Sequence, residues 1–215
     1  MNIFQKQDIA DSYDDYYDTD FGRNVDFAEK MIISELEQII PVHDNLLEVG
    51  CGTGHWTAFF VEKGYRVTGV DSSQSMLAVA QKKNIAADFV LAASEQLPFE
   101  DETFSVVVSI TMLEFVANKN SAIKEMHRVL KKGGRMIIGG LYSHSILGEN
   151  KDSDSVFKHA HLFDEKDLYS LFSEFKILKM REGVYINEEF EFIDSEQEIK
   201  DMPPLFFGLL LQKKI

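Results

Sequence analysis

The chain has 215 residues, of which 45% are hydrophobic and 27% charged, and these values predict one soluble globular domain rather than a disordered chain. With 22 basic against 36 acidic side chains the formal net charge is −14, which disfavours nucleic acid and anionic membranes as partners. The single cysteine, Cys51, excludes an intrachain disulfide and a cysteine-rich zinc site, as is typical of a reducing compartment.

We expect a cytoplasmic protein, because the sequence shows no targeting or membrane segment. Residues 1–8 lack the basic region and the long apolar run of a signal peptide. The longest nearly apolar stretch, residues 205–211, is far shorter than the roughly 20 residues that cross a bilayer.

Residues 8–40 are predicted to be helical. Tyr13, Tyr16 and Tyr17 are spaced to share one helical face. A rough amphipathic stripe then follows and ends at Pro41; its members are Phe27, Met31, Leu36, Ile39 and Ile40.

From residue 46 onward, short apolar strands alternate with helices. The predicted strands are 46–49, 66–70, 88–91, 104–110 and 136–138, and the predicted helices are 56–63, 121–130 and one that Ser72 or Ser73 caps and that runs to about Lys83. Residues 131–134, Lys-Lys-Gly-Gly, are predicted to end the helix over 121–130 and to form a turn. In these strands apolar and polar residues do not alternate, which is typical of strands that are covered on both faces. Such strands, separated by helices, predict an α/β fold with a doubly wound parallel sheet.

After about residue 142 the alternation becomes less regular. A helix is predicted over 164–175, then β-rich residues 176–193 and a final strand over 206–211. Strands that follow the fifth one predict an antiparallel element at one edge of the sheet.

A glycine-rich loop follows the first predicted strand and reads Glu48-Val49-Gly50-Cys51-Gly52-Thr53-Gly54. Glycine permits both a tight turn and the close approach of a ligand to the backbone. In the dinucleotide pattern G-x-G-x-x-G, counted from Gly50, the third glycine would fall at residue 55, which is His55. The alternative is a chance glycine-rich turn of an α/β protein.

Asp71 stands at the carboxyl end of the second predicted strand. A carboxylate at this place can accept hydrogen bonds from both hydroxyls of a ribose. The alternative is that Asp71 only caps the next helix, a role for which Ser72 and Ser73 compete.

Two motifs carry a resemblance to a known family. The acidic-x-G-x-G-x-G spacing resembles the first motif of the class I S-adenosylmethionine-dependent methyltransferases. Residues 93–99, Ala-Ser-Glu-Gln-Leu-Pro-Phe, resemble the D-A-E-x-L-P-F signature of their type 11 group, which includes ubiquinone/menaquinone-biosynthesis-like enzymes. Residues 125–134 and 13–23 are similar to further segments of the group, and specific motifs cover about residues 46–140.

The resemblance implies a Rossmann-like, mainly parallel seven-stranded sheet with an antiparallel edge strand, in a single domain of residues 1–215. Within it, residues 1–40 would form a helical lid, 41–141 the cofactor-binding core, and 142–215 a substrate-side loop with C-terminal strands. S-adenosyl-L-methionine is the implied cofactor. A small molecule is the expected methyl acceptor, bound by a monomer or homodimer.

The resemblance also assigns cofactor contacts. Glu48 would lie near the cationic methionine part of the cofactor, Asp71 at the ribose and Met76 against the adenine. In the lid, Arg23 would pair with the cofactor carboxylate. The full predicted set is Arg23, Glu48, Gly50, Cys51, Gly52, Gly54, Asp71, Ser72, Met76, Ser94, Glu95 and Thr111.

Two of these assignments have alternatives, and one residue departs from the family pattern. Met76 is equally suited to a plain core position, and residues 13–23, including Arg23, to a solvated acidic helix with an aromatic packing stripe. Ala93 replaces the aspartate that commonly accepts from the adenine amino group, so Ser94, Glu95 or water would have to substitute.

No catalytic signature is expected, because methyl transfer from a sulfonium mainly needs proximity, alignment and exclusion of water. His144, His161 and Tyr17 are the candidates for a base, and His159 shares the segment of His161. The His159-Ala160-His161 pair lacks a third ligand, so no metal is expected. The absent Asn-Pro-Pro-Tyr signature argues against amide or nucleobase nitrogens as acceptors.

Two other functions remain open at this point. One is a methyltransferase-fold protein that binds the cofactor without transferring methyl, as a sensor or partner subunit, which Ala93 leaves possible. The other is an NAD(P)-dependent oxidoreductase, against which His55 and the Leu97-Pro98-Phe99 loop argue.

Overall fold

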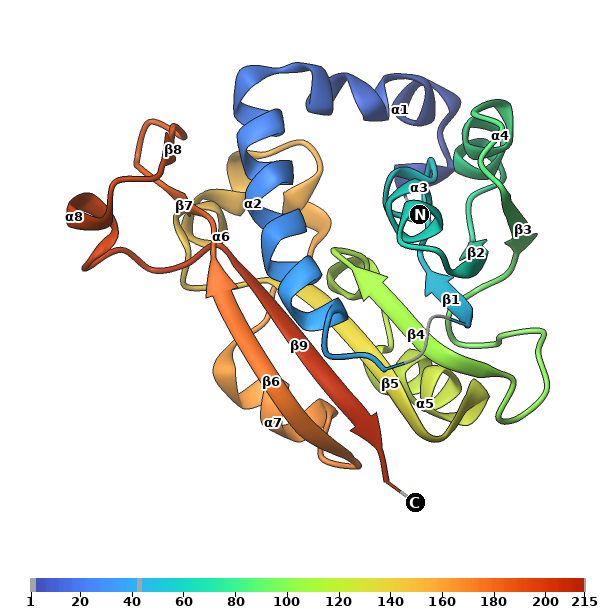
Figure 1. Cartoon of the computed structure of the whole chain (residues 1–215). Coiled ribbons are helices and arrows are strands. Elements are labelled where there is room, and N and C mark those ends of the chain that lie inside the picture. Colours follow the sequence, from blue (N-terminus) through green and yellow to red (C-terminus); the bar gives the residue numbers. More distant parts are fainter. Residues whose placement is uncertain (1–2, 42–43, 215) are drawn as a thin grey trace.

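A seven-stranded sheet in the order β3-β2-β1-β4-β5-β9-β6 runs through the molecule (Figure 1). The computed structural model describes residues 3–41 and 44–214. The strands are β1 (Asn45–Val49), β2 (Arg66–Asp71), β3 (Ala87–Leu91), β4 (Phe104–Ile110), β5 (Leu130–Leu141), β6 (Phe175–Gly183) and β9 (Phe206–Lys213). Strands β1 to β5 pair in parallel and β9 pairs antiparallel with β5 and β6. This confirms the predicted Rossmann-like sheet.

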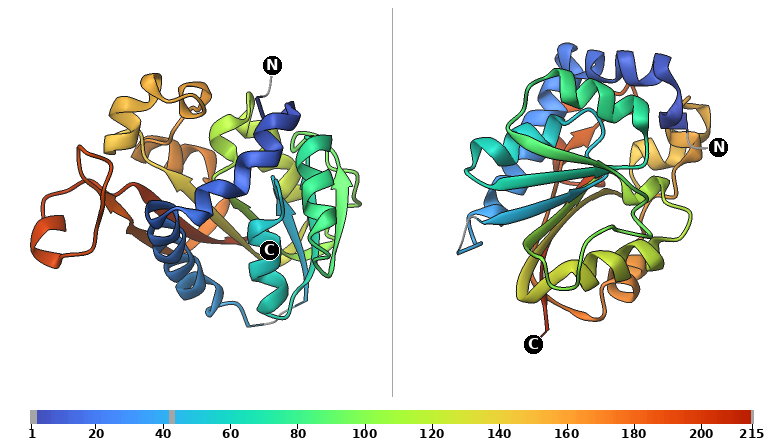
Figure 2. Two further views of the ribbon diagram at one scale, coloured as in Figure 1. Left: turned by 90° about the horizontal axis from the view of Figure 1, so that it is seen from above. Right: turned by 90° about the vertical axis from the view of Figure 1, so that its right-hand side faces the viewer.

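Helices cover both faces of the sheet, as Figure 2 shows. The helices are α1 (Gln7–Ser12), α2 (Asp20–Glu37), α3 (His55–Glu62), α4 (Gln74–Lys82), α5 (Lys119–Val129), α6 (Ile146–Asn150), α7 (Glu165–Leu171) and α8 (Glu196–Ile199), and a small ribbon pairs β7 (Tyr185–Ile186) with β8 (Phe192–Ile193). Leu46 packs in the core under α2 and α3, whereas its neighbour Leu47 packs under α5 and α7. Successive strand residues point to opposite faces, so both faces need apolar side chains.

The predicted antiparallel element lies at one edge of the sheet, where β9 pairs antiparallel with β5 on one side and with β6 on the other. Residues 206–211 are buried throughout, as suits a strand inside the sheet. The edge position belongs to β6, in which Lys176 and Arg181 are exposed. Charged side chains suit an edge strand because they discourage pairing with other chains.

The turn predicted at residues 131–134 is instead an irregular part of β5, which begins directly after α5. Leu130 pairs with Phe104, but the next pair joins Arg135 to Val106, so residues 131–134 bulge out of the ladder. The predicted helix stop near residue 130 is confirmed, and the turn is wrong. The helix predicted over 164–175 is shorter in the structure: α7 ends at Leu171, because β6 already begins at Phe175.

The N-terminal segment forms two helices joined by a 3₁₀ helix, η2 (Tyr13–Asp18), and Figure 1 shows α1 above the carboxyl ends of β1 and β4. The predicted apolar stripe of α2 is wrong at Phe27 and Met31, which are 67% and 52% exposed. Leu36 is buried as predicted, and the residues that share the buried face with it are Val25 and Ile33. Packing against β5, β6 and β9 decides which face of the helix turns inward.

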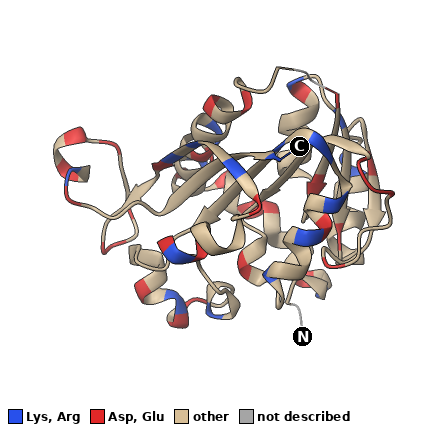
Figure 3. Ribbon diagram, turned by 90° about the horizontal axis from the view of Figure 1, so that it is seen from below, with Lys and Arg blue, Asp and Glu red and all other residues tan. Residues whose placement is uncertain are grey.

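Acidic side chains occur on elements all around the ribbon, so the net charge of −14 is not gathered on one face in this view (Figure 3). Among the described residues, none of the helices combines the length and the apolar character that crossing a bilayer requires.

Candidate active site

A cavity of about 280 Å³ lies at the carboxyl ends of β1, β2 and β4. Ligands of open α/β folds bind at this edge, because the loops that follow the parallel strands converge there. Most of the predicted cofactor residues line it: Gly50, Gly52, Asp71, Ser72, Met76, Ser94, Glu95 and Thr111. The structure therefore brings together residues from four separate segments of the sequence.

The glycine loop bends sharply at the floor of this cavity. Gly50, Gly52 and Gly54 have φ angles of 82°, 53° and 83°, a region that side chains with a Cβ rarely adopt. The backbone amide of Gly50 donates to the Val70 carbonyl at 2.7 Å, which holds the loop against β2. A Cβ at Gly52 would meet no protein atom within 4 Å, so the space beside this backbone is open to a ligand.

The Asp71 carboxylate connects the glycine loop with the start of α4. Its Oδ2 accepts from the Gly52 amide at 2.9 Å and its Oδ1 from the Ser73 amide at 2.8 Å. The helix itself is capped by Ser73, whose side chain accepts from the Met76 amide at 3.2 Å. Burial raises the pKa of Asp71, and the backbone hydrogen bonds oppose this effect.

The N-terminal segment is fastened over the cavity by hydrogen bonds to the start of α4. The Ser73 hydroxyl donates to the Phe4 carbonyl at 2.6 Å, and the Gln5 side-chain amide donates to the Ser72 carbonyl at 2.8 Å. Phe4 and Tyr13 line the cavity from this side. The arrangement brings residues 4 and 5 next to the β2–α4 junction.

His55, which takes the place of the third glycine of a dinucleotide motif, also holds the N-terminal segment. Its ring stacks on Tyr17 with centroids 3.7 Å apart and planes inclined by 2°. Its Nε2 lies 2.7 Å from an oxygen of Asp26 in α2. The neighbouring Thr53 hydroxyl donates to Asp14 at 2.7 Å. The loop thus binds the segment that covers it, and a glycine at position 55 would remove two of these contacts.

Three predicted cofactor residues lie behind the cavity wall. Glu48 is 2% exposed and accepts a hydrogen bond from Thr57 in α3, and burial raises the pKa of its carboxyl to about 8. Cys51 is buried, and burial raises the pKa of its thiol. Gly54 is the N-cap of α3. These residues shape the loop and are not among the described residues that line the cavity.

Arg23 and two of the base candidates lie elsewhere. Arg23 contacts Asp20 and the Asp18 carbonyl within its own segment. His144 is exposed beside the Tyr142 ring, and His161 is exposed where its backbone amide donates to the Glu114 carbonyl. None of the three is among the described residues that line this cavity or the larger one next to it. Within the described ranges no cluster of His, Cys, Asp and Glu is arranged for a metal ion.

A second cavity, of about 490 Å³, adjoins the first. Phe4, Tyr13, Thr111 and Phe115 line both, so they form a shared wall. Thr111, directly after β4, has a φ of 46°, which is strained for a β-branched residue. The remaining walls are mostly aromatic and aliphatic side chains from the N-terminal segment and from residues 141–157, and they include the base candidate Tyr17.

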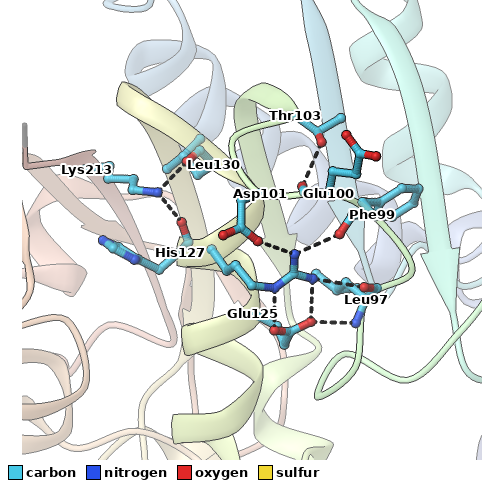
Figure 4. Close-up of polar contacts among 10 residues, drawn as sticks. Leu97, Phe99, Glu100, Asp101, Thr103, Glu125, His127, Leu130 and Lys213 are labelled. Carbon is cyan, nitrogen blue, oxygen red and sulfur yellow. Dashed lines mark hydrogen bonds and ion pairs between the residues drawn. The ribbon is translucent and has the colours of Figure 1, made fainter.

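Arg128 in α5 fixes the loop that follows β3, a role that sequence reasoning missed. Its guanidinium donates to the carbonyls of Leu97 at 3.0 Å and Phe99 at 2.7 Å, and to the carboxylates of Asp101 at 2.8 Å and Glu125 at 2.7 and 2.8 Å. Figure 4 shows these labelled partners gathered around it. The Glu125 carboxylate also accepts from the Leu97 amide at 2.8 Å. No local pattern in the sequence marks a contact between residues so far apart.

Replacing Arg128 by lysine is expected to lower the melting temperature by several degrees and to weaken cofactor binding severalfold. Lysine keeps the charge but not the planar fork, so hydrogen bonds together worth about 1–2 kcal/mol are lost. Thermal melting and calorimetry would measure both effects. Arg66→Lys, which alters an exposed pair with Asp44, is the matched control. A variant at position 128 that melts and binds like the control would contradict the role.

Comparisons with known proteins show to which proteins the chain is similar. The family model described as a methyltransferase domain, Methyltransf_11, matches residues 47–138. The chain is 33% identical to an uncharacterized protein of Methanocaldococcus jannaschii, over 94% of this chain and 93% of that protein. It is 32% identical to the uncharacterized methyltransferase YodH of Bacillus subtilis, over 81% and 78% of the two chains.

Among solved structures, the fold is similar to that of a protein from Thermotoga maritima, described as an S-adenosylmethionine-dependent methyltransferase and possible histamine N-methyltransferase. The TM-score is 0.74 at 23% identity, and the match covers 97% of this chain and 98% of that one. At 23% identity the similarity shows a shared fold and no more.

Proposed function

The chain belongs to the class I S-adenosylmethionine-dependent methyltransferases of type 11, and from this we propose that it methylates a small-molecule acceptor held in the second cavity. The first cavity would hold the cofactor. The observation that carries the proposal is that the two cavities adjoin and share four lining residues, Phe4, Tyr13, Thr111 and Phe115. A cofactor in the first cavity and an acceptor in the second would therefore lie next to each other.

The residues of the first cavity fit S-adenosylmethionine better than a dinucleotide. Its described lining carries the carboxyl groups of Asp71 and Glu95 and neither Lys, Arg nor His. A pyrophosphate would lie beside these carboxylates without a cationic side chain, whereas a sulfonium is itself a cation. The open space beside Gly52 gives the close backbone approach that the cofactor needs.

The cofactor supplies an activated methyl group, and the chain positions the reactants and keeps water out. Asp71 holds the ribose hydroxyls through the lone pairs that its two backbone contacts leave open. Met76 packs against the base, and Ser94 and Glu95 replace the aspartate missing at position 93. Phe4 and Tyr13 exclude water from above, since their segment is fastened to α4.

Calorimetric titration with S-adenosylmethionine, its demethylated product and NAD tests the cofactor assignment. We expect micromolar binding of both sulfur ligands and no binding of NAD. Binding of NAD alone would overturn the proposal in favour of an oxidoreductase.

Release of S-adenosylhomocysteine in the presence of an acceptor library then tests turnover. Turnover would support the enzyme. Cofactor binding without turnover on any acceptor would favour the alternative, a sensor or partner subunit that binds the cofactor and transfers nothing.

A further inference from the structure

Glu29 interrupts the buried face of α2 at the second cavity. Val25, Glu29 and Ile33 are spaced four residues apart, so they follow one another along one face of the helix. Val25 and Ile33 are 3% and 0% exposed, whereas Glu29 is half-buried and lines the cavity. If the buried face of α2 had been predicted correctly, the four-residue spacing would have shown that Glu29 is an acidic residue on that face.

The Glu29 carboxyl group makes no hydrogen bond and no ion pair within the described part of the chain, in contrast to the acids around it. Asp26 pairs with Lys30 at 2.7 Å and with His55 at 2.7 Å. Asp154, the other carboxylate of the cavity, accepts from the backbone amides of residues 156 and 157. A half-buried carboxyl group without a partner is only partly solvated, so this position favours a ligand that supplies a partner.

Burial raises the pKa of Glu29 to about 8, and the charges of Asp26 and Glu114 act in the same direction while that of Lys30 opposes them. A cation in the cavity would relieve this penalty, since it stabilises the ionised carboxylate.

The rest of the cavity suits a cation that carries apolar groups. Tyr16, Tyr17 and Phe21 line it together with aliphatic side chains, and its described lining contains neither Lys, Arg nor His. Aromatic faces attract cations, and a carboxylate beside them adds a charge partner. An anionic acceptor would meet Glu29 without a counter-charge, and a neutral apolar one would leave it unpaired.

We propose that the acceptor is a small apolar or aromatic amine, and that Glu29 selects it by pairing with the amine nitrogen. This inference rests on the proposed function, because it concerns the ligand of the acceptor cavity. Glu29 is a specificity-determining residue here, and no bond-making step is assigned to it.

Three probes that share one ring test the proposal: 2-phenylethylamine, 2-phenylethanol and phenylacetate. Each is titrated into the protein saturated with S-adenosylhomocysteine. We expect the amine to bind at least tenfold more tightly than the alcohol, and phenylacetate to bind most weakly. In Glu29→Gln the amine should lose its tenfold advantage. Glu35→Gln, on the same helix but exposed and paired with Arg181, should keep it.

The affinity for S-adenosylhomocysteine separates this test from that of the proposed function. It should be unchanged in both variants, and its absence in the unaltered protein would count against the cofactor site itself. If the cofactor product binds but the amine shows no advantage over the alcohol, or does not bind at millimolar concentration, the inference about the acceptor is overturned. An amine preference that survives in Glu29→Gln overturns the role of this residue.

Discussion

Replacing Asp71 by asparagine is expected to weaken binding of S-adenosylhomocysteine at least tenfold, about 1.4 kcal/mol. In the structure both carboxylate oxygens accept backbone hydrogen bonds, from Gly52 and Ser73. An amide turns one of these acceptors into a donor that faces an N–H group, so the glycine loop shifts and a ribose acceptor is lost. Calorimetry of the purified variant measures the effect.

Asp88→Asn is the matched control for this substitution, because Asp88 is an exposed aspartate on the neighbouring strand β3. Thermal melting shows whether each variant is folded at the temperature of the titration. A folded Asp71→Asn protein that binds S-adenosylhomocysteine like the control would exclude Asp71 from the cofactor site.

The protein is expected to lose stability as the pH rises from about 5 to 8. Burial raises the pKa of Glu48 to about 8 and of Glu114 to about 7, from the ordinary glutamate value of 4.5. Between these values the unfolded chain releases protons that the folded protein retains, so rising pH favours unfolding. The penalty is absent below the unfolded pKa and complete above the folded one. It amounts to several kcal/mol at most, at about 1.4 kcal/mol per pKa unit.

Thermal melting between pH 5 and 8.5 measures this dependence, and Glu48→Gln should flatten it. The glutamine oxygen still accepts from the Thr57 hydroxyl but carries no charge at any pH. Glu62→Gln, at an exposed position of α3, removes the same charge from the surface and controls for overall repulsion. Equal slopes for Glu48→Gln and the control would refute the contribution assigned to Glu48.

Much of the fold follows from local features of the sequence. The boundaries of β1, β2, β3 and β4 lie within one or two residues of the predicted ones, because short apolar runs and the turns after them are local properties. The same holds for the glycine loop and for Asp71, since a loop after one parallel strand and an acid after its neighbour must meet at one edge of the sheet. Their roles toward the cofactor remain predictions.

For α2, the sequence predicted the helix but not the face that is buried. The pattern around α2 indicated a helix correctly, but it placed Phe27 and Met31 on the buried face, where the structure has Val25 and Ile33. Glu29 was overlooked for the same reason. Which face of an amphipathic helix turns inward depends on the surface against which it packs, and residues far along the chain provide that surface.

By itself the sequence determined the strands, the helices between them, the glycine loop and the family. Only the tertiary structure decided that β9 lies between β5 and β6, that Arg128 holds the loop at Leu97, and that Glu29 faces a cavity. The difference has one physical cause. Backbone propensities and hydrophobic periodicity act over a few neighbouring residues, whereas strand order and side-chain pairing depend on contacts between segments that the chain brings together only on folding.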